Sequence, residues 1–257
     1  MDDISTKIRS YHNDNIKSNE PCFIGTNEQN LSVIEKILIQ PIKIEHGIQC
    51  HIGFSGWYNF DIAYWRKSDR IILCDINCTQ IEFLKQTLYI IRQNRIRQAF
   101  LAHMILYLDE RMMTFSLNVN EDKAYESFRS YGTSRDEINQ VSYEFERLGS
   151  WLNNDKSYTY IRKLALHDHI AIFCENICNT ETFRQLDHVL SENHIMTDTI
   201  YLSNIYDWMN NMEERIAFNK SLAILVNNKT LIIEAEQVFG LHQTVISGKK
   251  FLSRLTV

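Results

Sequence analysis

The chain has 257 residues and a formal net charge of −5, with 44% hydrophobic and 23% charged residues. This length predicts one large domain, and this composition is normal for a protein with a sizeable core. The acidic balance argues against a nucleic-acid-binding protein, which usually carries a basic stripe. No apolar run approaches the ~20 residues of a membrane-spanning helix, and the polar N-terminal sequence has no signal-peptide core. We therefore expect a cytoplasmic protein, or one exported without an N-terminal signal peptide.

Strand-like and helix-like segments alternate along the chain. After an irregular polar arm at 1–30, the patterns predict helices at 31–39, 58–67, 80–108, 180–193 and 211–228. They predict strands at 47–54, 70–77, 170–174, 199–202 and 230–237, and a weaker strand at 242–247. Thr79 and Glu82 form the capping-box pattern at the start of the third helix. This alternation favours one α/β domain, residues 1–257, with an open, mainly parallel sheet and a helical insertion at about 101–165 between the second and third core strands.

Glycines and polar residues lie at the carboxyl ends of four of the predicted strands, where ligands bind in such a sheet. They are Gly53, Ser55 and Gly56 at the first strand, Asp75 at the second, Glu175 and Asn176 at the third, and Ser203, Asn204 and Asp207 at the fourth. The two glycines allow backbone to approach a ligand closely. Asp75 lies 22 residues after Gly53, the separation at which a carboxylate accepts hydrogen bonds from ribose hydroxyls. Together these features predict a nucleoside site, although each alone also fits an ordinary turn or helix cap.

The glycine turn narrows the choice of nucleoside. A dinucleotide site uses G-x-G-x-x-G, but here the third glycine is missing and bulky Trp57 and Tyr58 follow the turn. No GK[ST] follows the glycines, so a P-loop is absent. We therefore expect a ligand without a pyrophosphate, such as S-adenosylmethionine, whose sulfonium suits acidic neighbours. NAD-linked chemistry stays open as an alternative.

The segments GFSGWYNFDIA, IILCDIN, AIFCENI and TIYLSNIYDWM, in this order, resemble class I S-adenosylmethionine-dependent methyltransferases, which have a Rossmann-like fold. The sequence is most similar to a bacterial and plant branch with DNxxSNE and GxGPEQNF-type motifs. The chain has DNIKSNE at 14–20 and retains Asn59 after the turn. It departs from the pattern at Ser55, where the branch has its middle glycine, and at Gly56 and Trp57, where the branch has Pro-Glu.

The resemblance implies an S-adenosylmethionine site and methyl transfer to an unidentified acceptor, a small molecule or a protein. The implied cofactor-binding residues are Asn19, Glu20, Gly53, Ser55, Gly56, Asn59, Asp75, Ile76, Glu175, Asn176 and Ser203. Asn204 would position the acceptor and Asp207 would act as a base. Aminocarboxypropyl transfer from the same cofactor is an alternative. A non-catalytic member that binds another protein through the helical insertion is a second alternative.

A metal site is not expected. The six cysteines include two C-x3-C pairs, whereas zinc knuckles use other spacings. We expect these cysteines to be buried, reduced thiols. His167 and His169 can share one face of a strand edge, but the sequence offers no third and fourth ligand.

Overall fold

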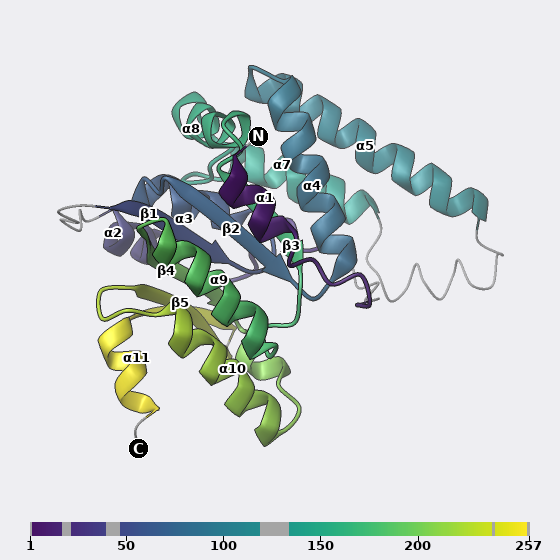
Figure 1. Cartoon of the computed structure of the whole chain (residues 1–257). Coiled ribbons are helices and arrows are strands. Elements are labelled where there is room, and N and C mark those ends of the chain that lie inside the picture. The colour runs from purple at the N-terminus through teal and green to yellow at the C-terminus, as the bar shows by residue number, and fades with distance from the viewer. Residues whose placement is uncertain (1, 17–21, 40–46, 119–133, 238–239, 256–257) are drawn as a thin grey trace.

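The computed structural model describes residues 2–16, 22–39, 47–118, 134–237 and 240–255. A six-stranded sheet in the order β3-β2-β1-β4-β5-β6 forms its centre (Figure 1). Its strands are β1 (Ile48–Gly53), β2 (Arg70–Asp75), β3 (Ile170–Cys174), β4 (Ile195–Ser203), β5 (Leu231–Gln237) and β6 (Leu241–Ser247). The first five in this order are parallel, and β6 is antiparallel to β5. The expected α/β class with a mainly parallel sheet is thus confirmed.

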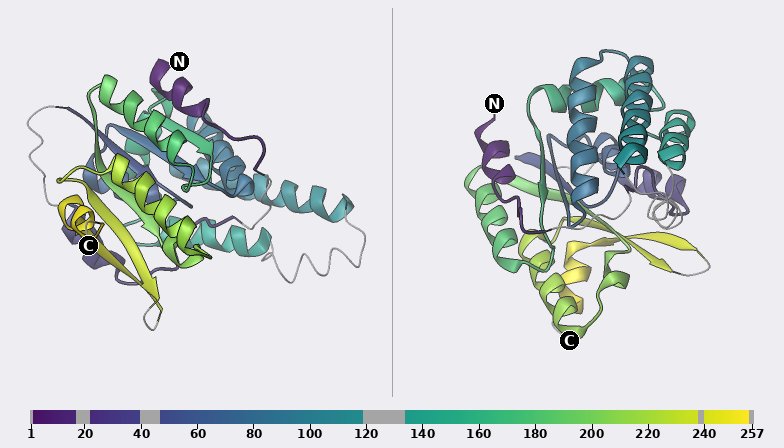
Figure 2. Two further views of the ribbon diagram at one scale, coloured as in Figure 1. Left: turned by 60° about the horizontal axis from the view of Figure 1, so that its bottom comes forward. Right: turned by 90° about the vertical axis from the view of Figure 1, so that its right-hand side faces the viewer.

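Helices cover both faces of the sheet (Figure 1). One face carries α1 (Asp3–Arg9), α9 (Thr180–Glu192), α10 (Met212–Leu225) and α11 (Gly248–Arg254). The other carries α2 (Leu31–Leu38), α3 (Tyr58–Arg66), α4 (Cys78–Gln93), α5 (Arg97–Asn118), α7 (Ser134–Glu146) and α8 (Asp155–Leu166). A short 3-10 turn, η1 (Ile205–Trp208), follows β4. Figure 2 shows α5 extending beyond the edge of the sheet.

The strands divide their side chains between the two layers. In β2, Ile72 and Cys74 pack with α9 and α10, whereas Ile71 and Leu73 pack with α4 and α8. This period of two is typical of a strand that is buried on both faces, and it explains why such strands read as continuous apolar runs. The predicted strands were visible in the sequence for this reason.

The prediction of an irregular N-terminal arm is wrong for Asp3–Arg9, which forms α1. Asp2 caps this helix, because its Oδ2 accepts a hydrogen bond from the Ser5 backbone N–H at 3.1 Å. Ile8 is buried against the core on the α9 side, with Ile4 packed beside it. Two apolar residues four apart among polar neighbours are a weak sequence signal, so packing against the sheet determines this helix.

Three further element boundaries differ from the prediction. The expected helix at 80–108 is two helices, because Asn94 adopts an extended conformation between α4 and α5. Thr79 is not the cap of α4; the Asn77 side chain accepts from the Thr79 backbone N–H at 3.0 Å and caps the helix two residues earlier. The fourth strand begins at Ile195, before the expected Thr199.

The order of the strands places a switch point between β1 and β4. From β1 the chain continues outward through β2 to β3, and from β4 it continues the other way through β5. A crevice forms beyond the carboxyl ends of the strands at such a point.

In the part of the chain that the structure describes, no helix is both long and apolar enough to cross a membrane.

Candidate functional site

The carboxyl ends of β1 and β2 bring two predicted site residues into contact. The Ser55 backbone N–H donates to Asp75 Oδ2 at 2.9 Å, and the Asn77 N–H donates to Asp75 Oδ1 at 2.8 Å. Burial raises the pKa of Asp75, while the N–H groups of Asn77 and Ser55 oppose that rise. The carboxylate therefore connects the turn after β1 to the start of α4.

A buried network fixes the same turn from beneath. The Asn59 amide nitrogen donates to the backbone oxygens of Phe54 and Gly56, both at 2.8 Å. Asn59 Oδ1 therefore accepts a hydrogen bond from the Nε2–H group of His51, at 3.0 Å. This leaves His51 Nδ1 to accept from the Thr199 hydroxyl at 2.8 Å. Burial lowers the pKa of His51 to about 4, so the ring is neutral near pH 7.

Other atoms of the protein lie very close to both glycines of the turn, Gly53 and Gly56. A Cβ at Gly53 would lie 1.6 Å from Asn59 Oδ1. A Cβ at Gly56 would lie 2.1 Å from the Phe23 carbonyl oxygen and 2.5 Å from that of Ile24. The Trp57 N–H also donates to the Ile24 oxygen at 2.7 Å. Close packing inside the protein is thus enough to require both glycines.

Glu175 follows β3 and is buried. Its Oε1 accepts from the Asn176 N–H at 2.8 Å and from Asn13 Nδ2 at 3.3 Å. Its Oε2 accepts from Asn179 Nδ2 at 2.8 Å and from the Thr182 hydroxyl at 3.1 Å. The carboxylate therefore links the start of α9 to the N-terminal segment, and its acceptor positions are filled by the protein.

A second buried carboxylate, Glu28, lies beside the end of β4. Its Oε1 accepts from the Tyr201 hydroxyl at 3.0 Å and from the Ser203 hydroxyl at 2.6 Å. Its Oε2 accepts from the Gln243 amide, which in turn accepts from the Tyr58 hydroxyl at 2.9 Å. Glu28 was not predicted from the sequence, because a single acid in a polar segment gives the same pattern as a solvated loop residue. Its partners come from β4 and β6, and Gln243 links it to Tyr58 of α3.

Two non-glycine residues at this edge have left-handed backbone conformations. Ser55 has φ 70° after β1, and Ser203 has φ 53° at the end of β4. These strands are neighbours across the switch point, and the Phe54 N–H donates to the Tyr201 oxygen at 3.3 Å. Such conformations cost free energy and cluster at functional sites. The two serines therefore mark this edge as the candidate site.

The remaining predicted residues lie around this edge. Asn204 precedes η1, and its Oδ1 is 3.4 Å from the Ser203 hydroxyl. Asp207 is exposed on η1. Ile76, beside Asp75, has 47% of its surface exposed and Trp208 has 72%. Asn19 and Glu20 lie outside the described residues.

The histidine pair and the cysteines are the residues with metal-ligand chemistry. The ring centroids of His167 and His169 are 5.8 Å apart. Within the described ranges no group of three or more His, Cys, Asp or Glu side chains is arranged to hold a metal ion. The six cysteines are free thiols, with Cys78 Sγ 3.4 Å from Cys174 Sγ.

Most of the chain matches one protein family. A family model described as "Domain of unknown function (DUF7790)" matches residues 23–250. The chain belongs to this family. The match contains the whole sheet, the glycine turn, Asp75, Glu28 and Glu175, so the candidate site lies on the family's domain. No curated protein matches the chain. The description of the family gives no activity, and the resemblance to methyltransferases stays a prediction.

Proposed function

We propose that the protein is an S-adenosylmethionine-dependent transferase with a Rossmann-like fold, which transfers a methyl group to an acceptor. One observation carries the proposal: the Asp75 carboxylate lies at the end of β2 and is hydrogen-bonded to the turn after β1, next to the switch point between β1 and β4. This is where a carboxylate binds ribose hydroxyls in nucleoside sites of α/β proteins. The expected insertion at about 101–165, whose described helices belong to α5, α7 and α8, would form the part that selects the acceptor.

The residues around Asp75 fit the ribose and the base of an adenosine. A carboxylate has about four acceptor positions, and the backbone groups that contact Asp75 belong to Ser55, Ile76 and Asn77. Capacity therefore remains for a ribose hydroxyl, and Asp75 is partly exposed. The exposed Ile76 beside it offers an apolar surface to a purine.

The free thiols also fit a reducing compartment such as the cytoplasm.

Other predicted contacts fit less well. Glu175 has both carboxylate oxygens occupied by protein donors, so Asn176 and Ile76 are better placed to meet the base. The carbonyl groups of Phe23 and Ile24 fill the space at Gly56. These contacts favour a second candidate function, a non-catalytic relative in which the protein itself occupies part of the former cofactor site.

The cofactor would supply an electrophilic methyl group on a sulfonium. Methyl transfer requires mainly in-line positioning of the acceptor, so a strong base is not obligatory. In our proposal Asn204 orients the acceptor, and the exposed Asp207 takes up a proton if the acceptor loses one. Aminocarboxypropyl transfer would use the same contacts with a different carbon of the sulfonium.

Calorimetric titration of the full chain with S-adenosylmethionine and S-adenosylhomocysteine tests the proposal. We expect one-to-one binding of both. Asp75→Asn should weaken binding by about tenfold or more, because hydrogen bonds to a charged group are lost. Asp109→Asn, on the exposed surface of α5, is the matched control and should bind like the unmodified protein.

Ile76→Ala adds a test that does not alter the hydrogen bonds of Asp75. Because Ile76 is about half exposed, the variant should fold normally and bind a few-fold more weakly. Absence of binding by both ligands to the folded protein would refute the transferase proposal and favour the non-catalytic relative. Enhanced NADH fluorescence on mixing would instead support a dinucleotide ligand.

A further inference from the structure

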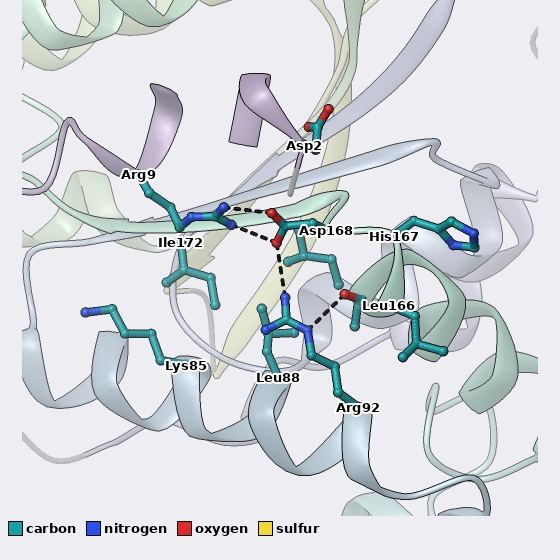
Figure 3. Close-up of a pocket in the computed structure, with 11 residues that line it drawn as sticks. Asp2, Arg9, Lys85, Leu88, Arg92, Leu166, His167, Asp168 and Ile172 are labelled. Carbon is teal, nitrogen blue, oxygen red and sulfur yellow. Dashed lines mark hydrogen bonds and ion pairs between the residues drawn. The ribbon is translucent and has the colours of Figure 1, made fainter. Parts of the chain in front are cut away.

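A separate cavity lies along the outer edge of the sheet. Its volume is about 510 Å³, and α1, α4 and the edge strand β3 surround it (Figure 3). This volume is within the range of about 300–1,000 Å³ typical of small-molecule sites. The cavity includes Asp168 and Ile170, at the start of β3, whereas Asp75 pairs with Cys174 at the other end of this strand. The steps along β3 to Cys174 correspond to roughly 13 Å from Ile170 and roughly 7 Å from Ile172, which also lines the cavity, so the cavity is separate from the candidate adenosine site.

Two guanidinium groups converge on one carboxylate in this cavity (Figure 3). Arg9, from α1, donates to Asp168 Oδ1 at 3.0 Å and to Oδ2 at 2.8 Å. Arg92, from α4, donates to Asp168 Oδ1 at 3.2 Å and to the Ala165 oxygen at 2.9 Å. One carboxylate neutralises only one of the two arginines. The arginine side chains are 31% and 36% exposed, so they reach the cavity with positive charge in excess.

The neighbouring charges do not remove this excess. Asp2, on the cavity wall, is paired with Arg70. Lys85, also on the wall, pairs with the exposed Glu82, and such a pair is weak in water. Burial opposes ionisation of Asp168, but the hydrogen bonds and charge of Arg9 and the charge of Arg92 lower its pKa. Asp168 therefore stays ionised and orients both arginines.

Backbone donors of β3 also face outward at this edge. The Ile71 N–H donates to the His169 oxygen, and the Glu175 N–H donates to the Asp75 oxygen, so odd-numbered residues pair with β2. The alternation of a parallel ladder directs the N–H and C=O groups of Ile170 and Ile172 away from β2. Outside the sheet ladder, no backbone hydrogen bond of either residue occurs within the described chain.

An apolar wall lies next to these donors. Leu88 from α4 and Ile172 from β3 both line the cavity, and Figure 3 shows Leu88 beside the guanidinium of Arg92 and Ile172 below that of Arg9. Each arginine has five N–H donors, of which its described partners use only a part. The cavity thus combines positive charge, unused hydrogen-bond donors and apolar surface in one place.

We propose that this cavity binds a small amphipathic anion, a phosphate or carboxylate group with a short apolar body. Arg9 and Arg92 hold the anionic oxygens, because a planar guanidinium presents N–H donors in pairs that match two oxygens of a carboxylate or a phosphate. The outward N–H groups of β3 supply further donors. The apolar body lies against Leu88 and Ile172.

NMR titration of the 15N-labelled full chain with four probes tests this proposal. Hexyl phosphate and heptanoate carry an anion and an apolar body, inorganic phosphate carries only the anion, and 1-hexanol only the body. We expect saturable shifts of the Ile170 and Ile172 amides with hexyl phosphate or heptanoate, and the tighter of these identifies the anion. Inorganic phosphate should bind at least tenfold more weakly, and 1-hexanol should not saturate these shifts.

Charge variants provide the matched comparison. Arg92→Gln should weaken binding at least tenfold, Arg92→Lys should weaken it less, and Lys85→Gln should have an effect of about two- to threefold. Arg254→Gln, with the same change of charge on exposed α11, should leave binding unchanged. Circular dichroism confirms that each variant folds. Equal binding by the Arg92→Gln and Arg254→Gln variants, shifts that map elsewhere, or phosphate as tight as hexyl phosphate would overturn the proposal.

Discussion

The fully buried His51 makes the stability of the fold depend on pH in a calculable way. Burial lowers its pKa from 6.5 to about 4. Between these values the unfolded chain binds a proton at His51 and the folded chain does not. The protein therefore has its full stability with respect to His51 above pH 6.5. The free energy of unfolding then decreases as the pH falls towards 4.

The size of this effect follows from the same two values. A shift of one pKa unit corresponds to about 1.4 kcal/mol, so the full effect of His51 approaches about 3 kcal/mol below pH 4. Between pH 7 and pH 4.5 the loss is about 2 kcal/mol. Other groups also titrate in this range, so the stability of the protein alone does not isolate His51.

His51→Gln isolates this contribution. Glutamine can donate to Asn59 and accept from Thr199, but it does not titrate. Urea unfolding of both proteins at several pH values between 7 and 4.5 gives the difference in the free energy of unfolding. We expect this difference to change by about 2 kcal/mol in favour of the variant as the pH falls. A difference that is constant with pH would show that His51 is not held neutral by burial.

Three further predictions concern the packing around the sheet. Asp61 is buried, and burial raises its pKa against the opposing charge of Arg147. As the pH rises from about 4 towards 7, ionisation of Asp61 therefore costs the folded protein stability. In the same unfolding assay, the Asp61→Asn variant should gain stability relative to the unmodified protein over this pH range. Arg66 and Asp198 form a buried ion pair at 2.7 Å, and removal of either partner should cost about 3–5 kcal/mol in urea unfolding, with less than additive loss in the double variant. Gly56→Ala should displace the backbone at 22–25, and hydrogen exchange should then be faster at the Ile24 amide; unchanged exchange would contradict the close contact.

The sequence patterns predicted the strands because most are buried on both faces. Ile170–Cys174 is a continuous apolar run with a polar exit, and its position in a parallel sheet follows from that pattern. The contact between Ser55 and Asp75 was also predictable, because the carboxyl ends of neighbouring parallel strands meet at one edge. The break between α4 and α5 was not predictable, because Asn94 interrupts a helical sequence pattern that continues on both sides of it.

Glu28 shows why part of the site was not predictable. Its partner Gln243 is 215 residues away in the chain, and its other partners end β4. No local pattern of charge or hydrophobicity distinguishes such an acid from a solvated loop residue. Likewise, the occupation of the Gly56 turn by Phe23 and Ile24 depends on the three-dimensional path of the N-terminal segment.

A crystal structure of the full chain with S-adenosylhomocysteine tests the central proposal most directly. We expect a ribose hydroxyl within roughly 3 Å of the Asp75 carboxylate, with the adenine against Ile76. The homocysteine end should lie towards Ser203 and Asn204. If the ligand is absent at high concentration, or binds elsewhere while 22–25 still fills the turn at Gly56, the transferase proposal is contradicted.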